Sequence, residues 1–280
     1  MTGTAPNTPD RNRETTPPAV PGASPSFPTP VPAVDQACRV LICLGHAPSR
    51  PLTLTEICRG IGIHMSKGHN ILKTLMRFGL VTRDPRSKTY RLGVGLLFLS
   101  RHVLENLDYR ETAASLLREL GDEPGCNAFL GMVSGDQFYV VCEVHGAEGI
   151  HLNIAVGHRF HVTFGAHGKA LVAHMDADEQ RRILARNRLY FYGSLEATRR
   201  RMKSLERELE QCRRTGYAVD PGHAQEGIRA VASPVFGLGS ALIGAVVLIG
   251  TFPRKAFSSK GPRTALIAGR ISKALGAGTP

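Results

Sequence analysis

The sequence lacks any apolar run long enough to cross a membrane. Its longest apolar stretch, from Ala241 to Gly250, falls far short of the roughly 20 residues that a spanning helix needs. The sequence also lacks an opening segment of basic and then apolar residues, which is the pattern of a secretion signal. We therefore expect a cytoplasmic protein that makes no contact with membranes.

Cysteine pairs at metal-binding spacing are missing too. The six cysteines are widely spaced and form no Cys-x-x-Cys pair, which disfavours both a disulfide framework and a zinc finger. Histidines are spaced irregularly between His145 and His223, and no carboxylate or cysteine stands at ligand spacing from His158 and His161. We expect buried thiols, no metal and no cofactor. The cysteines are Cys38, Cys43, Cys58, Cys126, Cys142 and Cys212.

Sequence motifs of common enzymes are absent as well. Gly237-Leu-Gly239 begins like a dinucleotide fingerprint but lacks the third glycine, and Gly168-Lys169 lacks the rest of a phosphate-binding loop. The sequence has no Gly-x-Ser-x-Gly nucleophile motif, and no cysteine has a readable His/Asn partner motif. An enzyme is therefore the least favoured class of function.

Positive charge is concentrated in one part of the chain. Residues 33–101 contain 11 lysines and arginines against 3 acidic residues, a net charge of +8 out of +12 for the whole chain. Such a region suits a polyanion such as DNA, because each neutralised phosphate releases counterions. A solubilising basic surface is the alternative. Residues 1–32 differ: they hold 9 of the 18 prolines and few large apolar residues, which predicts a disordered tail.

The basic region has the pattern of a helix-turn-helix. Apolar residues at helical spacing predict a first helix over Val34–Leu44. Thr53-Leu-Thr-Glu56 resembles a capping box and predicts a short helix through Cys58 that ends at Gly60-Ile-Gly62. A second short helix is predicted from Ser66 to Phe78. In this arrangement the second helix reads the DNA.

The predicted second helix has two different faces. At about 100° per residue, the half expected to be buried contains Gly68, Ile71, Leu72, Leu75, Met76 and Phe78. The other half offers hydrogen-bond donors and no carboxylate, as a surface that meets phosphates and base edges should. An ordinary solvated helix face would mix both signs of charge.

A wing and a linker helix are predicted after the second helix. Leu80–Arg83 and Thr89–Leu92 read as two strands around the basic turn Asp84–Lys88, with Tyr90 packing across the strands. The helix predicted over Gly93–Leu107 is apolar around its girth, so we expect it to join the domains and to contact a second copy. The DNA-binding residues expected on the second helix and the wing are Ser66, Lys67, His69, Asn70, Lys73, Arg77, Arg83, Arg86, Lys88 and Arg91.

The remainder of the chain alternates predicted strands and helices, which indicates an α+β sheet domain. A hairpin is predicted over Ala128–Val144, and further strands over Ile150–Val156, Tyr217–Asp220, Ile228–Phe236 and Ala241–Ile249. Helices are predicted over His167–His174, Asp176–Asn187, Leu195–Thr215 and Ser258–Leu275.

Three stretches together resemble the isocitrate lyase regulator (IclR) family of bacterial transcription factors. They are Leu52–Gly93, FGAHGKALVA at Phe164–Ala173, and GYAVDPGHAQEGIRAVASPV at Gly216–Val235. The resemblance implies a homodimer or homotetramer, a winged helix-turn-helix on a linker helix, and a GAF-like α/β domain that binds a small effector. The expected divisions are a disordered tail at 1–32, the winged helix at 33–93, the linker helix at 94–108 and the effector domain at 109–278.

The resemblance implies a repressor or activator that binds a double-stranded DNA operator. The excess apolar surface on the first helix and on the helix over Gly93–Leu107 predicts a homo-oligomer whose paired winged helices read an inverted repeat. Two residues of the second helix depart from the family pattern. Gly68 stands where a β-branched residue or alanine is common, which indicates a close approach between helices. Asn70 stands where arginine is common, and it should change the preferred sequence because asparagine can pair bidentately with adenine.

By resemblance, the effector pocket is formed by Phe164, Gly165, Ala166, His167, Asp220, Ala230, Val247 and Ile249. Members that bind small oxyacids can offer serines in place of Val247 and Ile249, and often a cysteine in place of Ala230. Burying a carboxylate without such donors costs several kcal/mol. We therefore expect a more apolar or aromatic effector, whose hydroxyl or amine binds Asp220 and His167. The alternatives are that these side chains fill the core, or that the domain serves only for oligomerisation.

Overall fold

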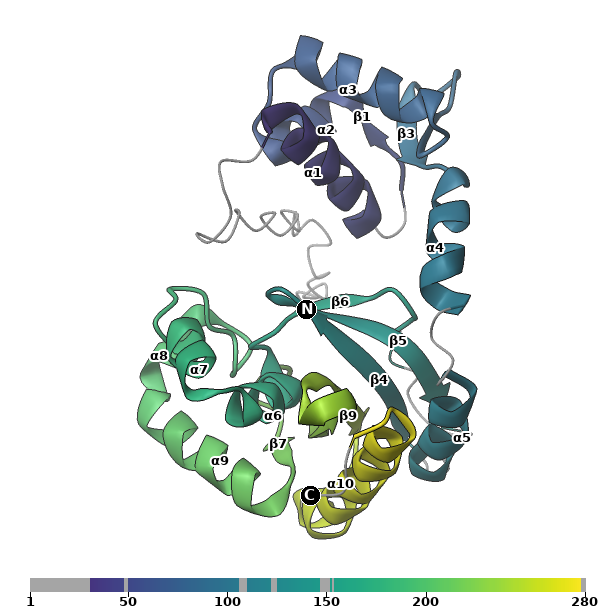
Figure 1. Cartoon of the computed structure of the whole chain (residues 1–280). Coiled ribbons are helices and arrows are strands. Elements are labelled where there is room, and N and C mark those ends of the chain that lie inside the picture. Colours follow the sequence, from purple (N-terminus) through teal and green to yellow (C-terminus); the bar gives the residue numbers. More distant parts are fainter. Residues whose placement is uncertain are drawn as a thin grey trace, which may run out of the picture. The chain divides into compact units, whose positions relative to one another are not determined.

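The computed structural model describes residues 31–47, 50–105, 110–121, 125–146, 152 and 154–277. Contacts divide the chain into two compact units, residues 1–106 and residues 107–280, whose elements are drawn in Figure 1. The predicted disordered tail lies outside the described residues up to residue 30. Among the residues that are described, no helix is long and apolar enough to cross a membrane.

The first unit packs helices against a small antiparallel sheet of strand order β1-β3-β2. Its helices are α1 (Pro32–His46), α2 (Leu54–Ile61), α3 (Met65–Arg77) and α4 (Gly95–Glu105). Its strands are β1 (Leu52–Thr53), β2 (Val81–Arg83) and β3 (Thr89–Leu92). Val40, Ile57 and Leu72 meet in the core, and Tyr90 packs there across the strands with 2% exposure. The unit is a winged helix-turn-helix, and α4 follows it.

Local signals in the sequence set the turn between α2 and α3. The Thr53 side chain accepts from the backbone N–H of Glu56, and Glu56 accepts from the N–H of Thr53, so the predicted capping box is present. These contacts, together with the Arg50 guanidinium, lower the pKa of Glu56 to about 2. Gly62 ends α2 in the left-handed region at φ 70°, a conformation that glycine adopts without strain.

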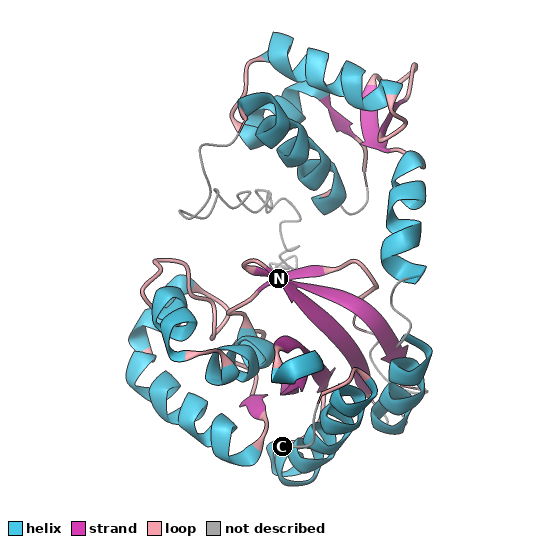
Figure 2. Ribbon diagram, in the orientation of Figure 1, coloured by secondary structure: helices cyan, strands magenta, loops and turns pink. Residues whose placement is uncertain are grey.

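The second unit is a six-stranded antiparallel sheet of order β6-β5-β4-β9-β8-β7, with helices on both faces (Figure 2). The strands are β4 (Cys126–Ser134), β5 (Gln137–His145), β6 (Arg159–His161), β7 (Ala218–Asp220), β8 (Arg229–Phe236) and β9 (Leu242–Gly250). The helices are α5 (Arg110–Gly121), α6 (Gly165–His174), α7 (Ala177–Leu184), α8 (Leu195–Arg200), α9 (Met202–Thr215) and α10 (Phe257–Ala274). This mixture confirms the predicted α+β class.

Alternate residues of the central strands supply two separate hydrophobic cores. On β9, Val246 and Leu248 pack on the side of helices α5 and α10, whereas Ala245 and Val247 pack on the side of α6 and α9. This alternation follows from strand geometry, in which successive side chains point to opposite faces.

Two predicted elements were wrong, and one helix was missed. A strand was predicted over Ile150–Val156, but residues 154–156 form a loop and a turn. Leu152 and Ile154 line a cavity and do not pair with a neighbouring strand. Residues 150, 151 and 153 lie outside the described part. The helix predicted over Leu195–Thr215 is broken at Arg201 into α8 and α9. Helix α5 was not predicted.

Candidate functional site

Helix α3 presents the residues that the sequence marks for DNA contact. Its opposite face is buried, as the helical projection predicts, with Gly68, Ile71, Leu72 and Leu75 covered. Phe78 departs from the projection, because it follows the last helical residue as the C-terminal cap and is 68% exposed. All of the predicted DNA-binding residues are exposed: Ser66, Lys67, His69, Asn70, Lys73, Arg77, Arg83, Arg86, Lys88 and Arg91.

The basic side chains on the exposed face of α3 have no ion-pair partner among the described residues. Within the described part of the chain, no carboxylate forms an ion pair with Lys67, Lys73 or Arg77. The wing turn contains one carboxylate, Asp84, and its oxygen accepts from the N–H groups of Arg86 at 2.8 Å and Ser87 at 3.4 Å. These hydrogen bonds lower the pKa of Asp84. The carboxylate therefore shapes the turn, and the surrounding basic side chains keep their donors for another partner.

Sequence reasoning missed His64 at the start of α3. The Nδ1 atom of His64 accepts from the backbone N–H of Ser66 at 3.4 Å and contacts the Ser66 hydroxyl at 2.9 Å. His64 is thus the N-terminal cap of the helix, and its ring contacts the hydroxyl that was expected to face DNA. Histidine is not a preferred capping residue, so propensity alone gave no signal.

Gly68 lies where α3 crosses α2. A Cβ atom built on Gly68 would lie 2.3 Å from the Cys58 Sγ atom, 3.4 Å from Ile63 and 3.5 Å from Leu54. The first distance is far inside van der Waals contact, and the other two are ordinary or slightly tight. The close helix approach predicted from the glycine is therefore present, and the Cys58 sulfur is the atom that fills the space.

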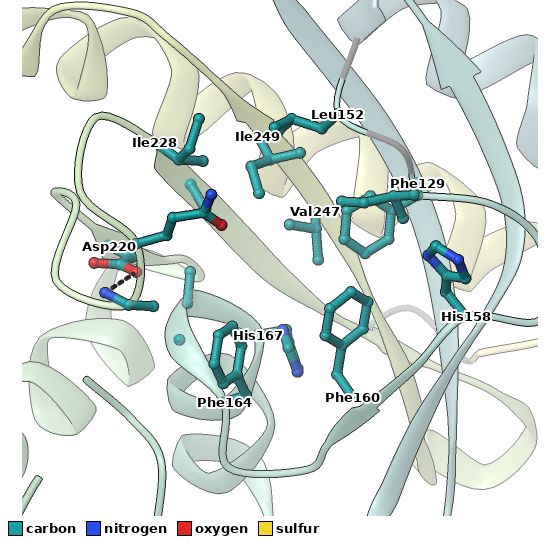
Figure 3. Close-up of a pocket in the computed structure, with 16 residues that line it drawn as sticks. Phe129, Leu152, His158, Phe160, Phe164, His167, Asp220, Ile228, Val247 and Ile249 are labelled. Atoms are coloured by element: carbon teal, nitrogen blue, oxygen red, sulfur yellow. Dashed lines mark hydrogen bonds between the residues drawn. The ribbon is translucent and has the colours of Figure 1, made fainter. Parts of the chain in front are cut away.

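The second unit contains a cavity of about 440 Å³ between the sheet and the first turn of α6 (Figure 3). Every residue predicted for the effector pocket lies in its wall: Phe164, Gly165, Ala166, His167, Asp220, Ala230, Val247 and Ile249. These positions come from four separate segments of the chain. These side chains border a cavity, and the binding of an effector there stays a prediction.

Strand pairing explains how distant residues reach the cavity together. Asp220 of β7 pairs with Ala230 of β8, and Ala230 pairs in turn with Ile249 of β9. Val247, two residues before Ile249 on β9, pairs with Phe129 of β4. Because side chains directly opposite each other on paired strands share a face, these residues form one continuous wall.

Half of the cavity wall was not predicted. Phe129 could have been found once β4 is paired with β9, because it lies opposite Val247. The others come from loops or from a short edge strand, where no periodicity marks an inward side chain. The additional lining residues are Phe129, Leu152, Ile154, His158, Phe160, Ala224, Gln225 and Ile228.

His167 lies among aromatic rings at the cavity wall. Its ring stacks on Phe138 with centroids 4.4 Å apart, and Figure 3 shows it between Phe160 and Phe164. The Nε2 atom lies 3.2 Å from the backbone carbonyl oxygen of His161. Burial lowers the pKa of His167 to about 4, so the ring is neutral near pH 7.

Asp220 organises the loop that closes one side of the cavity. Its Oδ1 atom accepts from the N–H groups of Gly222 at 3.1 Å and His223 at 2.7 Å, and its Oδ2 atom accepts from Ala224 at 3.1 Å. The side chain is only 4% exposed. Asp220 therefore holds this loop in place as well as facing the cavity.

A buried lysine ties α6 to the rest of the unit behind the cavity. The Lys169 ammonium pairs with Glu208 of α9 at 2.7 Å and donates to the carbonyl of Val219 at 3.2 Å, next to Asp220. It also lies 4.5 Å from the ring centroid of Tyr192. These contacts satisfy the buried charge and fix the strand that carries Asp220.

The remaining histidines, cysteines and acidic residues of the described part are the side chains that could ligate a metal ion. Across these residues, no three His, Cys, Asp or Glu side chains gather so that they could hold a metal ion. All six cysteines are free, and five are buried; the expectation of buried thiols is wrong for Cys38, which is exposed on α1.

Two family profiles match the chain. The IclR helix-turn-helix domain matches residues 33–85, and the profile described as bacterial transcriptional regulator IclR C-terminal matches residues 101–268. The chain belongs to the IclR family. Its relatives include the transcriptional regulator XynR of Escherichia coli, which is 30% identical over 217 residues, 77% of this chain and 84% of XynR. KdgR of Escherichia coli is 27% identical over 233 residues, 83% of this chain and 86% of KdgR.

Solved structures share the architecture. An IclR regulator from Alicyclobacillus acidocaldarius superposes with a TM-score of 0.73 at 27% identity, covering 89% of this chain and 100% of that one. An IclR homologue from Microbacterium hydrocarbonoxydans, solved with 4-hydroxybenzoate, shares the fold at a TM-score of 0.68 and 18% identity, covering 86% and 99% of the two chains. The protein is therefore an IclR-type transcriptional regulator, and its relatives are named as regulators and not as enzymes.

Proposed function

We propose that this IclR-type regulator acts in the cytoplasm and binds a double-stranded DNA operator through α3 and the wing. The observation that carries the proposal is the exposed, carboxylate-free face of α3, whose basic side chains have no ion-pair partner among the described residues. Desolvating such a face against protein would leave charges unpaired, whereas phosphates supply the missing anions. In this proposal residues 33–93 bind DNA, residues 94–108 link, and residues 109–278 respond to the effector.

Within α3 we assign different roles to different side chains. Asn70 should read a base, because its amide can pair bidentately with adenine. Lys67 and Lys73 should contact phosphates, which position the protein without reading sequence. Arg86 and Lys88 on the wing should add affinity by reaching a flanking phosphate or a narrow minor groove.

The test starts from DNA fragments selected from the genome with the wild-type protein. Asn70→Ala should relax the selected consensus, whereas Lys67→Ala or Lys73→Ala should weaken binding to most sequences and reduce the salt slope by about one each. Lys273→Ala, at an exposed position of α10, is the matched control for losing one positive charge. Wild-type footprints and salt dependence in all three α3 variants would contradict the proposed interface.

We also propose a homodimer or homotetramer that reads an inverted repeat. Around and within α4, Val94, Leu97, Phe98 and Leu99 are 79%, 70%, 71% and 54% exposed. Apolar side chains exposed in a cluster favour burial against another protein surface, and a second copy supplies an identical one. Two-fold symmetry of the protein would then match two-fold symmetry of the operator.

We propose that a small molecule in the cavity controls DNA binding. The cavity wall is mainly apolar, with three phenylalanines, and an apolar ligand gains roughly 25 cal/mol for each Å² that it buries. An aromatic or other apolar effector therefore fits better than a small oxyacid. The 4-hydroxybenzoate held by the Microbacterium homologue shows that the shared fold accommodates a ring-bearing molecule in that protein.

Replacing the two branched side chains of β9 tests this effector preference. Val247→Ser combined with Ile249→Ser should weaken binding of apolar ligands and improve binding of small oxyacids such as glyoxylate, as calorimetry would show. Val246→Ser is the matched control on the same strand, since its side chain lies in the opposite core. Tight glyoxylate binding by the wild type would contradict the proposed preference for apolar effectors and leave the proposal of effector control in place.

A further inference from the structure

Among its described residues, the cavity wall has no permanently charged cation for an anionic ligand. Among the described residues of its wall there is no lysine or arginine, and the polar members are His158, His167, Asp220 and Gln225. A ligand carboxylate buried there would lose its hydration without gaining a charged partner. The hydrogen-bonding character of these polar side chains then decides which ligand group the cavity can satisfy.

His167 presents an acceptor. A backbone carbonyl can only accept, so the contact between Nε2 and the His161 carbonyl oxygen places the single proton of the neutral ring on Nε2. The Nδ1 atom therefore keeps its lone pair, and no described group donates to it. His167 can satisfy a ligand donor through this atom, but it cannot donate to a ligand carboxylate.

Asp220 presents a second acceptor. Its carboxylate has about four lone-pair positions, and three of them receive the backbone N–H groups of the loop. The Oδ2 atom, which receives one of these, lies 3.6 Å from a Cβ built on Gly165 at the first turn of α6. One acceptor position of Oδ2 is therefore left beside the segment that carries His167.

His158 differs from these two groups. Its Nδ1 atom accepts from the backbone N–H of Ala155 at 3.2 Å, so a neutral ring carries its proton on Nε2 and can donate. Figure 3 shows His158 and Asp220 on opposite sides of the cavity. The cavity thus has acceptors at Asp220 and His167, a donor at His158, and in Gln225 an amide that can both donate and accept.

We infer that the effector is an uncharged, ring-bearing molecule with a hydroxyl group that donates to His167 Nδ1 or Asp220 Oδ2. This inference rests on the proposed effector control. A hydroxyl needs one acceptor for its single proton, whereas an ammonium brings three N–H donors, more than the two acceptor positions left at His167 and Asp220 can receive. A ligand carboxylate would place a second negative charge beside the buried carboxylate of Asp220.

The test compares three probes of matched shape on the full-length protein by calorimetry: 2-naphthol, 2-methoxynaphthalene and 2-naphthoate. 2-Naphthol should bind about tenfold more tightly than its methyl ether, because the ether leaves a buried acceptor unpaired. 2-Naphthoate should bind weakest, by about a further tenfold. Equal or tighter binding of 2-naphthoate would overturn the inference and leave effector control in place.

A variant assigns the hydroxyl contact. His167→Phe keeps a ring to stack on Phe138 but lacks Nδ1, so it should reduce the tenfold preference for 2-naphthol over its ether. The variant should bind 2-naphthol more weakly and the ether more tightly, because the ether no longer buries an unpaired acceptor. His174→Phe, on the same helix with its ring against Phe236, is the matched control. An unchanged preference in His167→Phe, with Asp220→Asn also unchanged, would refute the assigned contacts. If no probe binds while operator binding persists, the inference fails and the DNA-binding proposal stands.

Discussion

Replacing Gly68 by alanine should destabilise α3, although alanine is the better helix former. The new Cβ would lie 2.3 Å from the Cys58 sulfur, more than an ångström inside the optimal separation of about 3.5–4.0 Å. Overpacking a buried contact of this kind costs about 1–3 kcal/mol, whereas the gain in helix propensity is about 1 kcal/mol. The balance predicts a loss of stability of up to about 2 kcal/mol.

Removing the Cys58 sulfur should make Gly68→Ala stabilising instead of destabilising. In a Cys58→Ala background, the same Cβ would meet only Ile63 and Leu54 at 3.4 and 3.5 Å, so Gly68→Ala should stabilise α3 by about 1 kcal/mol. The double-mutant cycle should therefore give a coupling energy of about 1–3 kcal/mol between the two positions. Operator affinity should fall in Gly68→Ala and recover in the double variant.

The assay is amide hydrogen exchange in peptides from α3, because exchange reports local stability in a protein with two units. Gly269→Ala in α10 is the control, since a Cβ there meets nothing within 4 Å and should simply stabilise its helix. Equal stabilisation by Gly68→Ala with and without Cys58→Ala would refute the steric argument. The glycine would then need another explanation.

Three further predictions follow from the same structure. Reversing Arg86 and Lys88 to glutamate should weaken operator binding and reduce the salt slope by about two, while the selected consensus stays the same; a shifted consensus would contradict this. Phe98→Asp should lower the association state, measured by sedimentation at micromolar concentration, and a wild-type monomer would rule out the oligomer. His167 has its pKa lowered from 6.5 to about 4, so the stability that its neutral form contributes is present above pH 6.5 and is lost as pH falls toward 4. This loss is about 3 kcal/mol, and unfolding of His167→Phe should show a shallower pH dependence over that range.

Sequence patterns predicted those parts of the fold that depend on local interactions. The capping box at Thr53 and Glu56 and the apolar face of α3 both follow from spacing within one helix, and both are present. The break at Arg201 and the loop at residues 154–156 were missed, because apolar spacing does not say whether a side chain meets a sheet, a helix or a cavity.

The candidate site divides in the same way. The cavity positions inferred by resemblance all lie in the wall, but the protonation pattern of His167 depends on a carbonyl contact from His161 that no spacing reveals. His64 was also missed, since its cap is a matter of backbone geometry and not of residue preference. The DNA-facing side chains are exposed as expected, and their contacts with DNA stay a prediction.

The alternation along β9 has a consequence for how this regulator can evolve. Val247 and Ile249 border the cavity. Val246 and Leu248, which alternate with them along the strand, pack in the core on the opposite face of the sheet. Substitutions at Val247 and Ile249 can therefore alter which molecule is sensed while the core on the opposite face of the sheet stays intact. Duplicated copies of such a gene can diverge in the molecule they detect, because the sequences between them still encode a folded protein.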